Sequence, residues 1–85
     1  MNAKEKAKAA VWLLKEAVLE YVKDHPGATS REIKDELGLA CPNENGERED
    51  GLLWGIDNML IVEEKMRMEV VSHRTHRYII PSTQS

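Results

Sequence analysis

Apolar residues recur at helical spacing over residues 4–24, which predicts a long first helix with one apolar face. The pattern ends at His25-Pro26-Gly27, because proline disfavours helical geometry in the residue before it. The apolar stripe consists of Ala7, Val11, Leu14, Val18, Tyr21 and Val22. This face is therefore expected to pack on the core.

Trp12 and Leu19 fall outside that stripe, although they are one heptad apart. At about 100° per residue, both lie about 100° from the centre of the stripe. Two interpretations stay open. Either the pair forms a second apolar patch through which the chain dimerises, or the C-terminal strand or tail covers it.

A short second helix is indicated between Thr29 and Gly38, because both of its ends are marked. Thr29 and Glu32 have the spacing of a capping box, and Ala28 and Ile33 are placed as a hydrophobic staple. Gly38 follows the last helical residue, where a left-handed conformation costs glycine little. A helix this short needs larger elements packed around it.

Proline, asparagine and glycine mark residues 40–46 as a loop, and a third helix is predicted over residues 47–60. Gly51 and Gly55 lie a turn apart in it, which indicates close approach of either the first helix or a ligand backbone; helix packing is favoured, because it needs no partner. The predicted buried stripe is Leu52, Leu53, Ile56, Met59 and Leu60. The opposite, exposed face is expected to present Glu47, Asp50, Trp54, Asp57 and Asn58.

Alternating apolar and polar residues predict two antiparallel strands at residues 65–71 and 76–80. Residues 72–75 form the turn between them, and Pro81 ends the second strand. Residues 82–85 are expected to be a disordered tail. The chain is therefore interpreted as a single domain over residues 1–81.

Three stretches carry a family resemblance, namely "Ala-Thr-Ser-Arg-Glu-Ile-Lys-Asp-Glu-Leu-Gly-Leu", "Gly-Leu-Leu-Trp-Gly-Ile-Asp-Asn-Met-Leu-Ile-Val-Glu-Glu-Lys" and "Ser-His-Arg-Thr-His-Arg-Tyr-Ile-Ile". They resemble the second helix, the third helix with the first wing strand, and the wing hairpin of the winged helix-turn-helix family. The resemblance implies an α+β fold, with a three-helix core and a C-terminal β-hairpin wing. It also implies double-stranded DNA binding and a role in transcription regulation.

Composition bounds the class of protein but is ambiguous about nucleic acid. The chain has 85 residues, a net charge of −3 and one cysteine, Cys41, so no internal disulfide can form. No secretory signal or membrane-length apolar run is present, and a cytoplasmic location is expected. Residues 42–61 carry one basic residue against five acidic ones, whereas residues 70–85 carry two arginines and no acid. The distribution of charge therefore favours the C-terminal hairpin as the basic surface.

No constellation of residues indicates catalysis. His73, His76 and Cys41 are too few ligands for a metal site, and no metal or cofactor is expected. Paired acids such as Glu63 and Glu64 are typical of a solvated face. Since no nucleophile elbow or phosphate-binding glycine loop is present either, an enzyme is the least favoured class.

The favoured function is binding of double-stranded DNA through the second helix, the third helix and the wing. Trp54 is expected to be largely exposed, unless Arg74 or Arg77 covers its indole as a cation–π pair. The alternative is a protein–protein interaction module that uses the acidic face of the third helix around Trp54. The expected DNA contacts are Ser30, Arg31, Arg48, Trp54, Asn58, Arg74 and Arg77.

Overall fold

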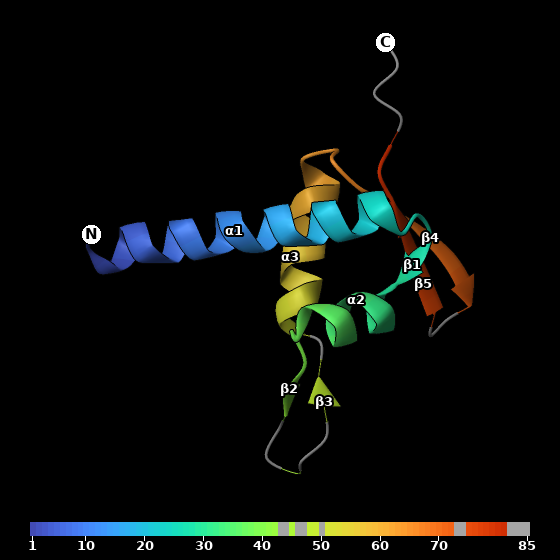
Figure 1. Cartoon of the computed structure of the whole chain (residues 1–85), viewed down its shortest axis with the longest axis horizontal. Coiled ribbons are helices and arrows are strands. Elements are labelled where there is room, and N and C mark those ends of the chain that lie inside the picture. Colours follow the sequence, from blue (N-terminus) through green and yellow to red (C-terminus); the bar gives the residue numbers. More distant parts are fainter. Residues whose placement is uncertain (43–44, 46–47, 50, 73–74, 82–85) are drawn as a thin grey trace.

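The computed structural model is an α+β arrangement of three helices and a three-stranded antiparallel sheet within the part of the chain that it describes (Figure 1). Described are residues 1–42, 45, 48–49, 51–72 and 75–81, with the backbone alone at 41–42 and 48–49. The expected α+β class is confirmed, and the order of elements is compatible with a winged-helix-like arrangement. The tail expected at residues 82–85 lies outside the described residues.

Helix α1 spans Ala3–Asp24, close to the predicted range. Its start is fixed by a capping box, in which the Glu5 backbone N–H donates to Asn2 Oδ1 at 2.8 Å. Ala, Lys and Glu, all strong helix formers, dominate the next two turns. Packing on the core begins at Val11, so Ala7 is exposed and the N-terminal half of α1 projects from the body (Figure 1).

The chain leaves α1 through a tight turn into strand β1, Ala28–Thr29. His25 caps the helix, its N–H donating to the Tyr21 carbonyl at 2.9 Å, and its ring stacks on the Tyr21 ring at 4.2 Å. Gly27 has a φ of 83°, a left-handed conformation that side chains other than glycine rarely adopt. The predicted end of the first helix is thus confirmed.

Helix α2 spans Ser30–Leu37, with Thr29 as its N-cap and Gly38 as its C-cap, but only the Thr29 half of the expected capping box is formed. Thr29 Oγ1 accepts the Glu32 N–H at 3.2 Å and donates to Glu32 Oε1 at 3.1 Å, so the Glu32 carboxylate meets the Thr29 hydroxyl. Gly38 is left-handed, with a φ of 67°. Ala28 and Ile33, the predicted staple, are both buried in the core.

The segment before the third helix differs from the prediction. Strand β2, Cys41–Pro42, pairs antiparallel with strand β3, Arg48–Glu49, where a loop and the first helical turn were expected. Helix α3 spans Gly51–Val62, so the predicted start at residue 47 is wrong. The proline and the glycine of this short polar segment do not distinguish a loop from a small hairpin, because turn residues occur in both.

The buried face of α3 is also rotated relative to the predicted one. Leu52 and Met59 are 43 % and 42 % exposed, whereas Asp57 is 1 % exposed. The observed stripe is Leu53, Ile56, Asp57 and Leu60, spaced as one helical face. The prediction exposed Asp57 and buried Leu52 and Met59, whereas the packing of α3 buries Asp57 and exposes Leu52 and Met59.

Strands β4, Arg67–Ser72, and β5, Thr75–Ile79, form the expected antiparallel hairpin, and β1 adds a third strand in the order β1-β5-β4. β5 is therefore the central strand. Its Tyr78 is fully buried and faces the helices. The core consists of Val18, Val22, Ala28, Ile33, Leu53, Ile56, Leu60, Met66 and Tyr78.

One long-range ion pair ties α1 to the end of α3. Lys15 Nζ donates to Glu63 Oε2 at 2.7 Å across 48 residues of sequence. This hydrogen bond holds the pKa of Glu63 below its ordinary value of 4.5. The pair thus clamps α1 to the end of α3 at the point where α1 leaves the body.

Candidate nucleic-acid interface

Pairing of β1 with β5 brings the start of α2 beside the return strand of the hairpin. In this register Ala28 lies opposite Tyr78 and Thr29 opposite Arg77. Ser30 Oγ then donates to Tyr78 Oη at 3.2 Å. Two groups of predicted contacts, nearly fifty residues apart in sequence, are therefore joined at one edge of the molecule.

Arginine side chains are available at this edge. Arg31 is 87 % exposed, and its Nε lies 4.0 Å from Asp35 Oδ2, a weak pair one turn along α2. Arg77 is exposed in β5, and Arg67 is exposed at the start of β4. The weakly paired Arg31 can rearrange around a phosphate, whereas Arg77 lies opposite the exposed Glu69 in the β4–β5 pair, so a phosphate competes there with a carboxylate.

One backbone N–H group in the first turn of α2 already has a hydrogen-bond acceptor. Thr29 accepts the Glu32 N–H, and the carboxylate of Glu32 lies in the same turn. A carboxylate at a helix N-terminus is stabilised by the dipole and repels a phosphate. The arginines, rather than the backbone N–H groups of α2, are therefore the chemically suitable anion-binding groups here.

The prediction that Trp54 is largely exposed is wrong. Its indole is half-buried and meets the His76 ring edge-on, with ring centroids 5.3 Å apart and planes at 84°. Because side chains alternate along a strand, Arg77 points to the opposite face from His76 and does not cover the indole; Arg74, the other candidate for a cation–π pair, lies outside the described residues. Trp54 therefore connects α3 to β5.

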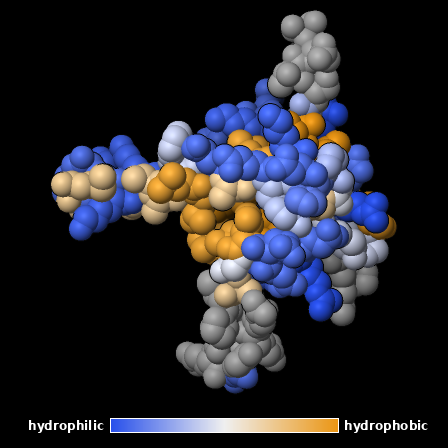
Figure 2. Space-filling model, viewed as in Figure 1, coloured by the Kyte–Doolittle hydropathy of each residue, from blue (hydrophilic) through white to orange (hydrophobic). Residues whose placement is uncertain are grey.

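The exposed face of α3 is neutral, not acidic. Asp57, expected there, is buried, and the predicted face residues Glu47 and Asp50 lie outside the described residues. The exposed positions on α3 are Gly51, Leu52, Gly55, Asn58, Met59 and Val62. Figure 2 shows apolar residues gathered below α1 and over α3, which agrees with this composition.

The two glycines of α3 do not serve the predicted close approach of α1. A Cβ added at Gly51 or Gly55 would meet nothing within 4 Å. Both glycines face open space, so packing on the first helix is not their role. Two glycines one turn apart predict a helix surface without side chains, but they do not show whether that surface faces another helix or open space.

Asn58 is exposed as predicted and shares a face with Trp54, one turn away. The sheet separates these two from Arg77, which points away from the helices. The side chains of Arg48 and Arg74 lie outside the described residues, as does His73. The strand register therefore places the start of α2, with Ser30 and Arg31, beside the strand that carries Arg77, whereas Trp54 and Asn58 lie on α3. Arg67, which joins the first group, is recognisable in the sequence only as the polar start of a strand.

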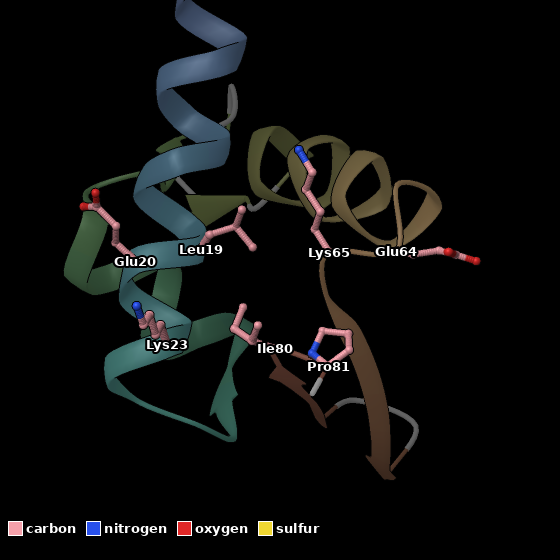
Figure 3. A pocket seen from close by; sticks show the side chains of 7 residues that line it. All are labelled: Leu19, Glu20, Lys23, Glu64, Lys65, Ile80 and Pro81. Atoms are coloured by element: carbon pink, nitrogen blue, oxygen red, sulfur yellow. The ribbon is translucent and has the colours of Figure 1, made fainter. Parts of the chain in front are cut away.

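A shallow groove of about 380 Å³ lies between α1, the α3–β4 connection and the end of β5 (Figure 3). Leu19, Ile80 and Pro81 form its apolar floor, while Glu64 points away from them. Leu19 is thus partly covered by the C-terminal end of β5, one of the two outcomes left open for it. Since convergent polar groups are a mark of small-molecule sites, this groove has little of their character.

Among the described residues, no three His, Cys, Asp or Glu side chains are grouped to hold a metal ion. In the same residues, no helix is both long and apolar enough to cross a bilayer.

Comparisons of the chain with protein-family models, with curated proteins and with solved structures give no match.

Proposed function

We propose that the chain is a winged-helix protein that binds double-stranded DNA, mainly through phosphates, with the edge formed by the start of α2 and strand β5. The observation that supports this is the register in which Thr29 lies opposite Arg77, because it brings the start of α2, which carries Arg31, beside the strand that carries Arg77. The β4–β5 hairpin then serves as the wing. The family resemblance extends the proposal to transcription regulation.

Electrostatics favour this surface over α3. Arginine binds phosphate through a planar fork of N–H donors, and Arg31 and Arg77 are both exposed. The exposed face of α3 offers Asn58 as its polar base-reading group, suited to adenine, but no exposed charge of either sign among its described residues. Binding is therefore expected to depend strongly on salt and weakly on sequence.

The test is a titration of labelled duplex DNA, followed by fluorescence anisotropy at several salt concentrations. Arg31→Ala and Arg77→Ala should each weaken binding and reduce the slope of log K against log salt by up to about 0.9. Lys65→Ala is the matched control, because Lys65 is an exposed cation in the α3–β4 connection, away from this edge. Equal effects of all three substitutions, or no binding at low salt, would rule out the proposed surface.

A second candidate function, protein–protein interaction through α3, is favoured by the exposed apolar positions Leu52, Met59 and Val62. The surface is apolar rather than the acidic one expected around Trp54. Met59→Lys tests in the same titration whether α3 contacts DNA. Unchanged affinity and salt slope are expected if only the α2–β5 edge meets the duplex, whereas stronger binding with a steeper slope would place α3 at the DNA and overturn its assignment as a protein-binding face.

A further inference from the structure

One row of side chains on α1 has a charge pattern that the fold of a single chain does not use. Its members are four residues apart and follow one ridge of the helix. Read from the N-terminus, two cations precede a tryptophan and two anions follow it. The row consists of Lys4, Lys8, Trp12, Glu16 and Glu20.

This row, called the α1 ridge below, is accessible along its length. Trp12 is 60 % exposed, Lys4, Lys8 and Glu20 are exposed, and Glu16 is half-buried. The first two turns of the helix project beyond the body (Figure 1). No ion pair joins the four charged members to any other described residue.

The same pattern is unfavourable within one helix. Like charges four residues apart repel, and this applies to Lys4 with Lys8 and to Glu16 with Glu20. The positive end of the helix dipole lies at the N-terminus, where the ridge is positive. The arrangement therefore lacks an explanation in the stability of the isolated helix.

We propose that the α1 ridge is a self-complementary interface, on which a second copy of the chain packs antiparallel about a two-fold axis through Trp12. Each Trp12 then meets its counterpart at the centre. Lys8 faces Glu16 of the partner subunit, while Lys4 and Glu20, each about 80° from Trp12 around the helix, flank the contact with opposite charges. A parallel pair would place lysine on lysine and glutamate on glutamate, so the charge order selects the antiparallel one.

Trp12 points away from the core, because it follows Val11, which packs on the core, and lies about 100° from it around the helix. The two-fold axis is perpendicular to both α1 and the Trp12 direction, so it reverses α1 and turns the two Trp12 side chains toward each other. The bodies of the two copies are then offset in opposite directions along the paired helices. Two ridges of this kind interdigitate in the most common class of helix packing, and a two-fold contact uses the same patch twice.

Charge reversal of the full-length chain tests the pairing by sedimentation equilibrium. Lys4→Glu with Lys8→Glu makes the ridge wholly negative, and Glu16→Lys with Glu20→Lys makes it wholly positive. Each double variant should dimerise at least about tenfold more weakly than the wild type, and an equimolar mixture should form a one-to-one heterodimer. Salt should weaken the wild-type dimer and the heterodimer alike.

Trp12→Lys and Leu13→Lys form a matched pair, because both residues are 60 % exposed and adjacent on α1. Trp12→Lys should abolish the dimer, and Leu13→Lys should leave it intact, with circular dichroism showing both variants folded. A wild type that is monomeric at about 100 µM overturns the proposal. So do equal effects of the two substitutions, or a mixture of charge variants that fails to associate.

Discussion

Removal of the Trp54 side chain measures how strongly α3 holds the β4–β5 hairpin. Trp54 is half-buried, and its contact with His76 is edge-on at 5.3 Å, a favourable geometry for an aromatic pair. Truncation of a fully buried tryptophan to alanine costs about 3–5 kcal/mol of unfolding free energy. For this half-buried indole we therefore expect about 2 kcal/mol, lost in the absence of any partner.

The share due to His76 is separable with a double-mutant cycle. The variants are Trp54→Ala, His76→Ala and their combination, each unfolded in urea and followed by far-UV circular dichroism. An aromatic pair is worth about 0.5–1.5 kcal/mol beyond the area it buries, and this is the expected coupling energy. For a domain of this size, the loss in Trp54→Ala corresponds to a decrease in melting temperature of roughly 8–16 °C.

Trp12→Ala, measured at a protein concentration at which the chain is monomeric, is the control, because Trp12 is the other tryptophan and is exposed. Its effect on the unfolding free energy should stay within about 0.5 kcal/mol. A coupling energy below about 0.3 kcal/mol would refute the view that His76 and Trp54 join the sheet to α3. An equal loss in both tryptophan variants would refute the assignment of Trp54 to the packed interior.

Two further predictions concern stability. The Lys15 hydrogen bond lowers the pKa of Glu63 in the folded chain. The stabilisation of the folded state by this bond is therefore complete above the ordinary pKa of 4.5 and is lost as the pH falls below it. Glu63→Gln should flatten the acid limb of a plot of unfolding free energy against pH. Gly55→Ala should stabilise the fold by up to about 1 kcal/mol, since Gly55 is helical and faces open space. Gly38→Ala should destabilise it by about 1–2 kcal/mol, because Gly38 has a left-handed φ. Thermal unfolding of both variants checks this, and melting temperatures that shift in the same direction would contradict it.

The elements that the sequence predicts well are those with local signals. Helix α2 is set by Thr29, Glu32 and Gly38, all within ten residues, and its two ends lie where the caps place them. The β4–β5 hairpin follows from an alternation that one strand repeats in the next. Neither prediction required knowledge of distant contacts.

The features that the sequence does not predict depend on distant partners. Strand β1 is two residues long and has no period of its own, and only pairing with β5 makes it a strand. Asp57 is polar, yet the rotation of α3 against the core buries it. The same rotation exposes Met59 and turns Trp54 toward His76. The rotation of α3 about its own axis thus accounts for the wrong placement of Asp57, Met59 and Trp54.

The proposed dimer and the proposed DNA surface share no residue, which lets each fail independently. They are nevertheless linked if both copies of Arg77 contact one duplex, because the second contact is then intramolecular and raises the affinity by about 10²–10⁴. Trp12→Lys, which removes the dimer and adds a cation far from β5, then lowers the affinity and roughly halves the salt slope. If each chain binds DNA alone, the same variant leaves the slope per chain unchanged. The salt slope of Trp12→Lys thus distinguishes a protein that must dimerise to bind from one whose two surfaces act separately.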